Sequence, residues 1–179
     1  QDQYIAAFGG LQHFEFRNDE SVRSTPLPIS VAEREALSDH LSLYYTGVTR
    51  RAEGILKEMS ARTDANQEAL FRIRALAGEA RAAIVARDWE RLGRVTDEGW
   101  QWKRGLTPGI SSPEIDRQFE TAKAAGAFGG KVTGAGGGGF LLLVHPPERS
   151  RQIAAALSPL PRLPVRITPE GSRILGVHR

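Results

Sequence analysis

Apolar side chains recur every three or four residues through two long segments, residues 64–86 and residues 88–106. Such spacing places them along one face of a helix, so both segments are predicted to be amphipathic helices. The apolar positions are Leu70, Ile73, Leu76, Ala77, Ala80 and Ile84 in the first segment and Trp89, Leu92, Val95, Gly99 and Trp102 in the second. A third helix is predicted from Ser112 to about residue 126, because a capping serine stands before Pro113.

Shorter apolar and β-branched runs predict strands on both sides of these helices. The predicted strands cover residues 11–16, 22–27, 41–45, 139–145, 164–169 and 172–177. Three shorter helices are predicted at residues 2–8, 49–59 and 146–157, the second of them capped by Thr49. From about residue 41 onward this order predicts an α+β domain, in which helices cover one face of an antiparallel sheet.

The composition is that of an ordinary globular protein. The 179 residues are 40% hydrophobic and 25% charged, which is enough for one or two small domains with a buried core. No apolar run approaches the roughly 20 residues that a membrane helix needs, so no membrane partner is expected. The absence of cysteine excludes disulfides and thiolate metal sites, and it fits a cytoplasmic location.

The charge pattern argues against a nucleic-acid partner. The net charge of +3 is modest and dispersed, and the densest basic stretch, residues 149–179, is interrupted by prolines and apolar residues. A nucleic-acid binder would be expected to cluster its cations. The four histidines are isolated in the sequence and show no spacing typical of metal ligands, so no metal site is assigned to this chain.

The densest motif is the glycine run from Gly134 to Gly139, which leads directly into an apolar segment. Its members are Gly134, Ala135, Gly136, Gly137, Gly138 and Gly139. Successive amides in such a loop can form an anion-binding nest, and phosphate is the anion expected there. A flexible linker would usually have polar flanks, whereas Phe128 and an apolar strand flank this run. It is neither a Walker A loop nor a dinucleotide fingerprint, because no Gly-Lys-Ser/Thr closes it and it leads into a strand.

The stretch from Gly129 to Phe140 resembles the third motif of the GHMP kinases, a family that includes galactokinase and mevalonate kinase. Within that family the resemblance is closest to the sugar kinases that phosphorylate D-glycero-D-manno-heptose 7-phosphate. Four further stretches share the resemblance, namely residues 1–4 with 8–11, 43–50, 109–116 and 171–174. Together they extend over essentially the whole chain. Only the glycine loop and the pair Asp2-Gln3 are specific to it, and the other stretches are supporting.

The resemblance implies a ferredoxin-like C-terminal domain at residues 41–179, preceded by the tail of an N-terminal domain at residues 1–40. It also implies ATP with Mg²⁺ as cofactors, and a phosphorylated sugar as the other partner. The first residue, Gln1, falls within a motif, and the Gly-Ser-rich nucleotide loop of the family is not found. We therefore expect an incomplete portion of a longer kinase, inactive alone, whose exposed interdomain surface could cause homo-oligomerisation.

Asp2 is the candidate catalytic residue. From position alone it would be a helix N-cap. The resemblance implies instead that its carboxylate faces the acceptor hydroxyl, orients it and accepts its proton. Thr133 is expected to cap the amides of the glycine loop, and Arg50 is a candidate for binding a substrate phosphate, with a surface arginine an equal alternative. Lys131, Lys103 and Arg104 are expected to be solvated, and one of the two tryptophans Trp100 and Trp102 is expected to be in the core.

Two other interpretations remain open. The enzyme could phosphorylate another sugar, such as fucose or galactose. Alternatively, the chain could be a non-catalytic ligand-binding or interaction domain of the same fold that keeps the glycine loop for folding. Asp2 discriminates between these classes, because a binding module does not need a carboxylate that faces an acceptor.

Overall fold

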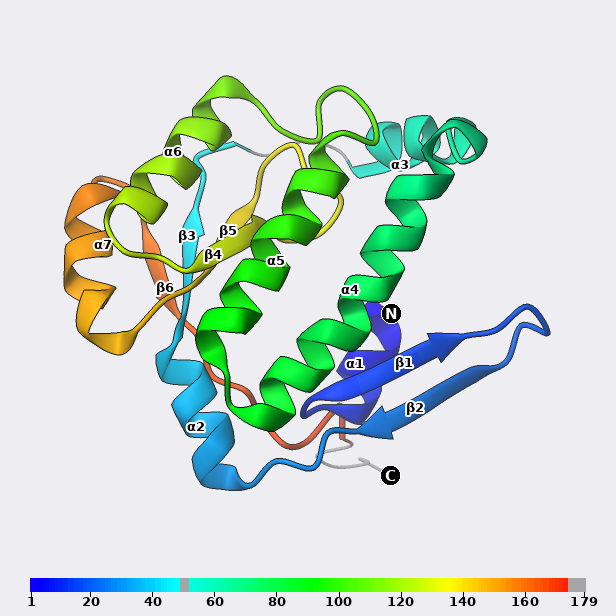
Figure 1. Ribbon diagram of the computed structural model, residues 1–179, viewed down its shortest axis with the longest axis horizontal. Coiled ribbons are helices and arrows are strands. Elements are labelled where there is room, and N and C mark those ends of the chain that lie inside the picture. The colour runs from blue at the N-terminus through cyan, green and yellow to red at the C-terminus, as the bar shows by residue number, and fades with distance from the viewer. Residues whose placement is uncertain (49–51, 174–179) are drawn as a thin grey trace, which may run out of the picture.

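A computed structural model describes residues 1–48 and 52–173 of the chain. The fold is α+β, as predicted (Figure 1). The helices are α1 (Asp2–Phe8), α2 (Val31–Asp39), α3 (Ala52–Ala61), α4 (Gln67–Ala86), α5 (Trp89–Arg104), α6 (Pro113–Ala124) and α7 (Ser150–Ala156). The strands are β1 (Gln12–Phe16), β2 (Val22–Pro26), β3 (Leu41–Tyr45), β4 (Gly129–Val132), β5 (Phe140–Val144) and β6 (Arg162–Pro164). No helix in the described part of the chain is long and apolar enough to cross a membrane.

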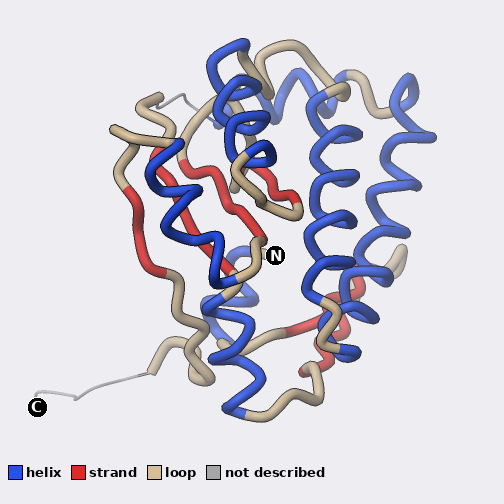
Figure 2. Tube along the Cα trace, turned by 60° about the vertical axis from the view of Figure 1, so that its left-hand side comes forward, coloured by secondary structure: helices blue, strands red, loops and turns tan. Residues whose placement is uncertain are grey.

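The centre of the molecule is a four-stranded antiparallel sheet in the order β4-β5-β3-β6, with helices packed beside it (Figure 2). Alternate residues of a strand point to opposite faces, and one face of β4, β5 and β3 is buried, whereas the edge strand β6 is exposed. Tyr44 of β3 pairs with Leu141 of β5, and Leu141 pairs with Val132 of β4. These side chains form the core with residues from the covering helices, namely Trp100 of α5, Phe119 of α6 and Ile153 of α7.

The core is held mainly by large apolar side chains. Trp100 and Phe119 stack with their ring centroids 6.1 Å apart and their planes inclined by 17°. Each fully buried side chain of this size contributes on the order of 1.5–3 kcal/mol through removal from water. Trp100 is buried and Trp102 is only partly buried, so the expectation that one tryptophan belongs to the core is confirmed, although the predicted apolar stripe named Trp102.

Helix α5 and strand β4 approach each other without side chains between their backbones. A Cβ atom added at Gly93 would lie 2.3 Å from the Cβ of Phe128, and one added at Gly129 would lie 2.3 Å from the carbonyl oxygen of Gly93. Only glycine is compatible with this spacing. This close contact fixes the position of α5 relative to β4, the strand at one edge of the sheet.

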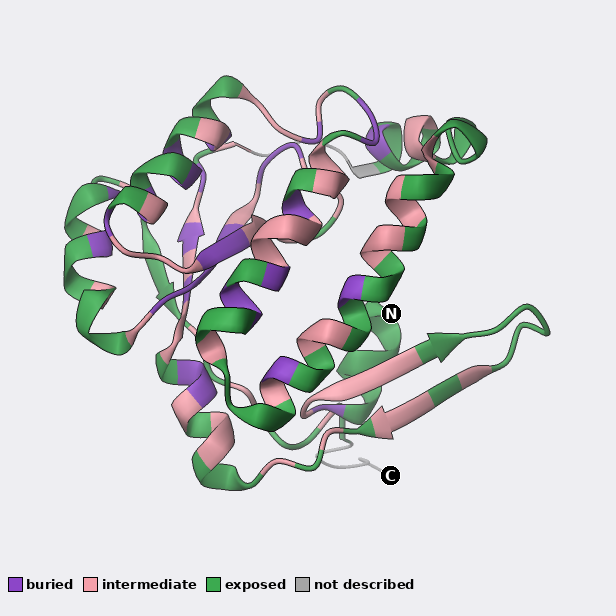
Figure 3. Cartoon of the chain, in the orientation of Figure 1, coloured by how far each residue is buried: buried purple, intermediate pink, exposed green. Residues whose placement is uncertain are grey.

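The first 26 residues form a separate, more open layer. Strands β1 and β2 pair as an antiparallel hairpin, and α1 lies against it through aromatic side chains. Tyr4 contacts Phe14 and Phe16, each with a centroid separation of 5.8 Å. Helix α1 has no buried residue, and Figure 3 shows this layer mostly exposed or half-buried.

The structure corrects several predicted elements. Helix α2 was not predicted, although Ser30 and Glu33 form a capping box at its start. Strand β4 was also not predicted and takes up the beginning of the glycine motif. The last described strand is β6, so the strand predicted at residues 164–169 is wrong, because residues 165–173 run as an irregular segment. Thr49, the predicted helix cap, and residues 174–177 lie outside the described residues.

Candidate active site

The glycine run is the connection of the β4–β5 hairpin. Five residues of this loop have positive φ angles, from 71° at Gly134 to 145° at Gly138, which only glycine adopts without strain. Two positions also have no room for a side chain. A Cβ at Gly136 would lie 2.7 Å from Cγ2 of Ile110, and one at Gly138 would lie 2.4 Å from the carbonyl oxygen of Val48. The loop is therefore a shaped structure and not a linker, as predicted.

Part of the expected anion nest is used inside the protein. The amide of Gly137 donates to the Ile110 carbonyl at 2.7 Å, and the amide of Gly139 donates to the Val48 carbonyl at 2.8 Å. The side chain of Ala135, within the glycine run, packs against the hydrophobic core. These contacts hold the loop against the segments that precede α6 and follow β3. The amides of Gly137 and Gly139 are thus committed to the fold.

Thr133 does not cap the loop amides. Its hydroxyl donates to the carbonyl oxygen of Phe140 at 3.3 Å, and its amide donates to the same oxygen at 2.9 Å. Thr133 therefore closes the β4–β5 hairpin. A similar role belongs to Thr46, whose hydroxyl and amide both donate to the Gly139 carbonyl at about 3 Å.

The structure brings together three charged residues beside this loop: Asp2, Lys103 and Lys131, here called the aspartate–lysine cluster. Lys103 lies in the last turn of α5, and its ammonium donates to the carbonyl oxygen of Gly134. Burial and, to a lesser extent, the positive charge of Lys131 lower the pKa of Lys103 to about 8, while the negative charge of Asp2 opposes both effects. Burial likewise lowers the pKa of Lys131, again against the charge of Asp2. The expectation that both lysines are solvated is wrong.

Asp2 itself is exposed and lies inside α1 as its first residue. The N-cap position belongs to Gln1, and no side chain caps the helix, so the simple N-cap interpretation of Asp2 is wrong. Its negative charge opposes the lowering of the pKa of Lys103 on α5 and of Lys131 on β4. The carboxylate from the start of the chain and the glycine loop are therefore neighbours in space.

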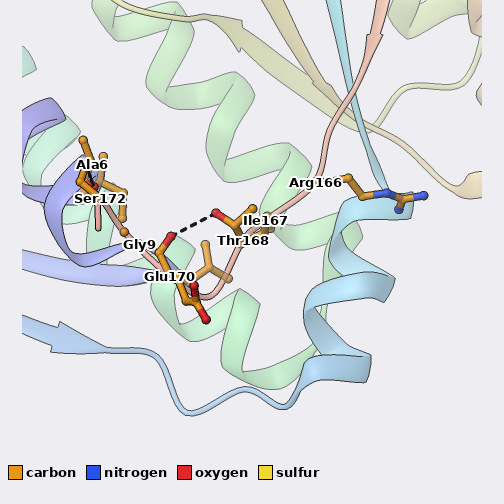
Figure 4. A pocket seen from close by; sticks show the side chains of 11 residues that line it. Ala6, Gly9, Arg166, Ile167, Thr168, Glu170 and Ser172 are labelled. Carbon is orange, nitrogen blue, oxygen red and sulfur yellow. Dashed lines mark hydrogen bonds between the residues drawn. The ribbon is translucent and has the colours of Figure 1, made fainter. Parts of the chain in front are cut away.

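Helix α1 lies against the irregular segment at the other end of the described chain, and Figure 4 shows residues of both around a pocket. The amide of Gly10 donates to the Thr168 carbonyl at 2.8 Å, and the amide of Ser172 donates to the Ala6 carbonyl at 2.7 Å. A Cβ added at Gly171 would lie 2.0 Å from the Ala7 carbonyl oxygen. A cavity of about 510 Å³ lies along this contact. Residues 168–172 therefore act as a strap that holds the helix carrying Asp2.

The remaining candidates are not part of this arrangement. Arg50, the candidate for a substrate phosphate, lies outside the described residues. Arg104 is not solvated as expected, because it forms an ion pair with Asp116 at 2.6 Å. Among residues 1–48 and 52–173 there is no group of three or more His, Cys, Asp or Glu side chains that could hold a metal ion.

Sequence reasoning missed Lys103. Lys103 follows the buried Trp100 by three residues, so both side chains lie on the same face of α5. This spacing was the only sign in the sequence that Lys103 is partly buried, because its hydrogen-bond partner, Gly134, lies 31 residues away.

Comparisons with known proteins place this geometry in context. The family profile described as GHMP kinases C terminal matches residues 80–159. The chain is 31% identical over 159 residues to the D-glycero-alpha-D-manno-heptose 7-phosphate kinase of Campylobacter jejuni, which is 88% of this chain and 47% of that protein. It is 30% identical over 174 residues to the L-fucokinase/L-fucose-1-P guanylyltransferase of Bacteroides fragilis, which is 90% of this chain and 18% of that protein.

The fold comparison agrees with the sequence comparison. The structure superposes on the crystal structure of a D-glycero-D-manno-heptose 1-phosphate kinase from Bacteroides thetaiotaomicron with a TM-score of 0.69 and 26% identity, over 97% of this chain and 48% of that one. The chain thus spans about half the length of the heptose kinases it matches.

Proposed function

We propose that this chain carries the C-terminal domain of a GHMP kinase and serves an ATP-dependent sugar kinase, as the match of residues 80–159 to that family supports. The observation that supports this most directly is the position of Asp2, which lies beside two lysines and the glycine loop although it comes from the opposite end of the chain. A carboxylate next to cations and a backbone turn suits the transfer of a phosphoryl group to a hydroxyl.

In this proposal Asp2 orients the acceptor hydroxyl and accepts its proton. The acceptor oxygen forms a bond to the γ-phosphorus of ATP while the bond from that phosphorus to the β–γ bridging oxygen breaks, and ADP leaves with the electron pair. Such a general base contributes about 10²–10⁴-fold to the rate. The glycine loop supplies the shape of the site, because a side chain at Gly136 or Gly138 would collide with its neighbours.

Magnesium commonly accompanies the phosphates of ATP in phosphoryl transfer and screens their charge. The described residues hold no carboxylate cluster for it, so no step of this mechanism depends on a metal ligand from this part of the chain. The residues that act here are Asp2 and the lysines around it.

For the substrate we propose D-glycero-D-manno-heptose 7-phosphate, phosphorylated at its anomeric hydroxyl. The similarity to the heptose 7-phosphate kinase of Campylobacter jejuni supports this choice. Fucose is the second candidate, supported by the similarity to the Bacteroides fragilis fucokinase. The two differ in chemistry, because the heptose substrate carries a phosphate of its own and fucose does not.

The test uses the complete gene product that contains these residues. It is incubated with ATP and, separately, with heptose 7-phosphate, fucose, galactose and mevalonate, and ³¹P NMR identifies any new phosphate ester. We expect a new anomeric phosphate with heptose 7-phosphate. Turnover of fucose alone would replace the heptose proposal, and phosphorylation of none of the sugars would contradict the sugar-kinase proposal.

Substitution of Asp2 tests its role. Asp2→Asn should lower kcat by at least about a hundredfold, because the amide cannot accept the proton. The affinity for nucleotide should change little. Asp64→Asn, at an exposed aspartate of the short turn before α4, is the matched control and should keep full activity. Near-normal turnover of Asp2→Asn would exclude Asp2 as the base.

A further inference from the structure

Lys103 is the one lysine of α5, and the fold places its ammonium at the glycine loop. Trp100, one turn earlier on the same face, is 1% exposed and anchors the end of the helix in the core. The ammonium of Lys103 donates to the carbonyl oxygen of Gly134, at the start of the loop. Its position is therefore set by a buried helix and by a backbone hydrogen bond.

The positive charge of this site has fewer carboxylate partners than two nearby arginines of the long helices have. Arg104 is paired with Asp116, and Arg72 of α4 is paired with both Glu79 and Glu98. By contrast, Lys103 and Lys131 share the influence of a single carboxylate, that of Asp2. Two half-buried ammonium groups with one carboxylate beside them leave an excess positive charge, which an anion would stabilise.

We propose that Lys103, assisted by Lys131, is a second catalytic residue that binds the oxygens of the phosphoryl group during transfer. This inference rests on the proposed kinase function. An ammonium has three donors, and only one of those of Lys103 is used by the Gly134 carbonyl. The other two are available to phosphate oxygens on the side of the acceptor hydroxyl that Asp2 orients.

The chemistry of the reaction favours cations at this place. The transferred group carries negative charge on its peripheral oxygens, and catalysis depends on positioning it and stabilising that charge. A donor held in place before the reaction is worth about 10²–10³-fold in rate in comparable sites. The backbone hydrogen bond to Gly134 and the burial of Trp100 hold Lys103 in this way.

The first experiment measures steady-state kinetics of the complete gene product with the sugar substrate and ATP. Lys103→Met should lower kcat by about a hundredfold or more, because the charge that stabilises the transition state is lost. Lys103→Arg should retain activity to within about tenfold, since it keeps the charge. Lys57→Met, at an exposed lysine of α3, is the matched control and should behave like the unmodified enzyme.

The pH dependence of kcat/KM separates a charge role from a purely structural one. Lys103 has its pKa lowered to about 8 by burial and by Lys131, so activity should fall as the pH rises through about 8 and the ammonium loses its proton. In Lys103→Arg this alkaline limb should disappear from the measurable range. In Lys131→Met it should move to higher pH, because the repelling charge is gone and Asp2 remains.

These outcomes distinguish the two proposals. If Lys103→Met keeps most of its kcat while Asp2→Asn is inactive, the kinase function stands and the role of Lys103 is excluded. An alkaline limb that is unchanged in Lys103→Arg and in Lys131→Met would also overturn it. If no sugar is phosphorylated at all, the kinase proposal itself fails.

A second experiment does not depend on activity. Inorganic phosphate is titrated into the complete gene product, and the side-chain NMR signals of Lys103 and Lys131 are followed at several pH values. Phosphate should raise the pKa of Lys103, and the amide signal of Gly134 should shift with it. The shift should be lost in Lys103→Met and retained in Lys57→Met. Absence of any effect of phosphate on Lys103 in the folded chain would contradict the proposal.

Discussion

The four-stranded sheet with its helices and the layer made of α1, β1 and β2 are stabilised to very different extents. In the sheet domain, the large side chains of Trp100, Tyr44 and Phe119 are almost fully buried. In the N-terminal layer, Phe8 and Phe16 remain 52% and 56% exposed, and α1 buries no residue. The lysines and the glycine loop of the proposed site thus belong to the rigid region, whereas Asp2 belongs to the loosely held one.

This difference suggests a division of roles within the site. The sheet domain fixes the cations and the shape of the loop, which must not move when phosphate binds. The carboxylate that receives the acceptor proton is placed by a short helix whose contacts are a strap of backbone hydrogen bonds and a few aromatic rings. Substitutions in the two regions should therefore differ in how strongly they affect global stability.

The largest difference is expected between Trp100 and Phe16. Trp100→Ala should lower the free energy of unfolding by about 3–5 kcal/mol, because it leaves a cavity next to Phe119. Phe16→Ala should cost about 0.5 kcal/mol or less, since its ring is mostly in water. Urea denaturation of the chain, followed by circular dichroism, measures both. Similar losses for the two variants would contradict the proposed contrast between the regions.

An intermediate effect is expected within the glycine loop. Gly138→Ala should destabilise the fold by about 2–4 kcal/mol, because the added methyl collides with the Val48 carbonyl at a backbone angle that disfavours alanine. Gly134→Ala is the matched control: it has a positive φ but nothing within 4 Å, and should cost only about 1–2 kcal/mol. Denaturation midpoints decide the comparison. Equal costs would show that close contact is not what requires glycine at position 138.

At the strap, a small global effect is expected together with a large local one. Gly171→Ala should lower the global free energy of unfolding by about 1 kcal/mol or less, although its methyl cannot fit against the Ala7 carbonyl, because the strap can detach without unfolding the sheet. Hydrogen exchange at the amides of Gly10 and Ser172 should nevertheless become much faster.

One control variant accompanies Gly171→Ala. Gly78→Ala, inside α4 with open space around it, should leave exchange at these amides unchanged and slightly stabilise the chain. Unchanged exchange at Gly10 in Gly171→Ala would show that the strap does not hold α1.

Much of the fold could be predicted because the local signals agree with the global structure. The apolar spacing of α4 and α5, the Ser112–Pro113 start of α6 and the apolar run of β5 all specify one conformation. Strand β4 could not be predicted in this way. Gly129 and Gly130 have weak strand propensity. Glycine is needed at these positions because other backbone segments approach closely, and this approach is seen only in the folded chain.

The end of the chain shows the same limit. Apolar and polar residues alternate in residues 164–169, as they do in a strand. After β6, however, backbone groups of this segment form hydrogen bonds with partners outside the sheet. The amide of Ile167 donates to the Ser38 hydroxyl, and the Thr168 carbonyl accepts from Gly10. These partners are more than a hundred residues away, so tertiary contacts override the local pattern. The half-buried environment of Lys103 was not predicted for the same reason. Asp2 was a candidate because the sequence resembles a kinase family, not because of its position in the sequence.

The side-chain-free contact between Gly93 and Gly129 has a mechanical consequence for the two lysines. Gly93 and Lys103 are ten residues apart on one helix, which corresponds to a rigid arm of about 15 Å. At the other end of this arm, Gly93 contacts Gly129 of β4, and Lys131 lies two residues after Gly129 on the same strand. A methyl group added at Gly93 would collide with Phe128 and push this part of α5 away from β4, so the spacing of the two ammonium groups depends on a contact that neither lysine makes.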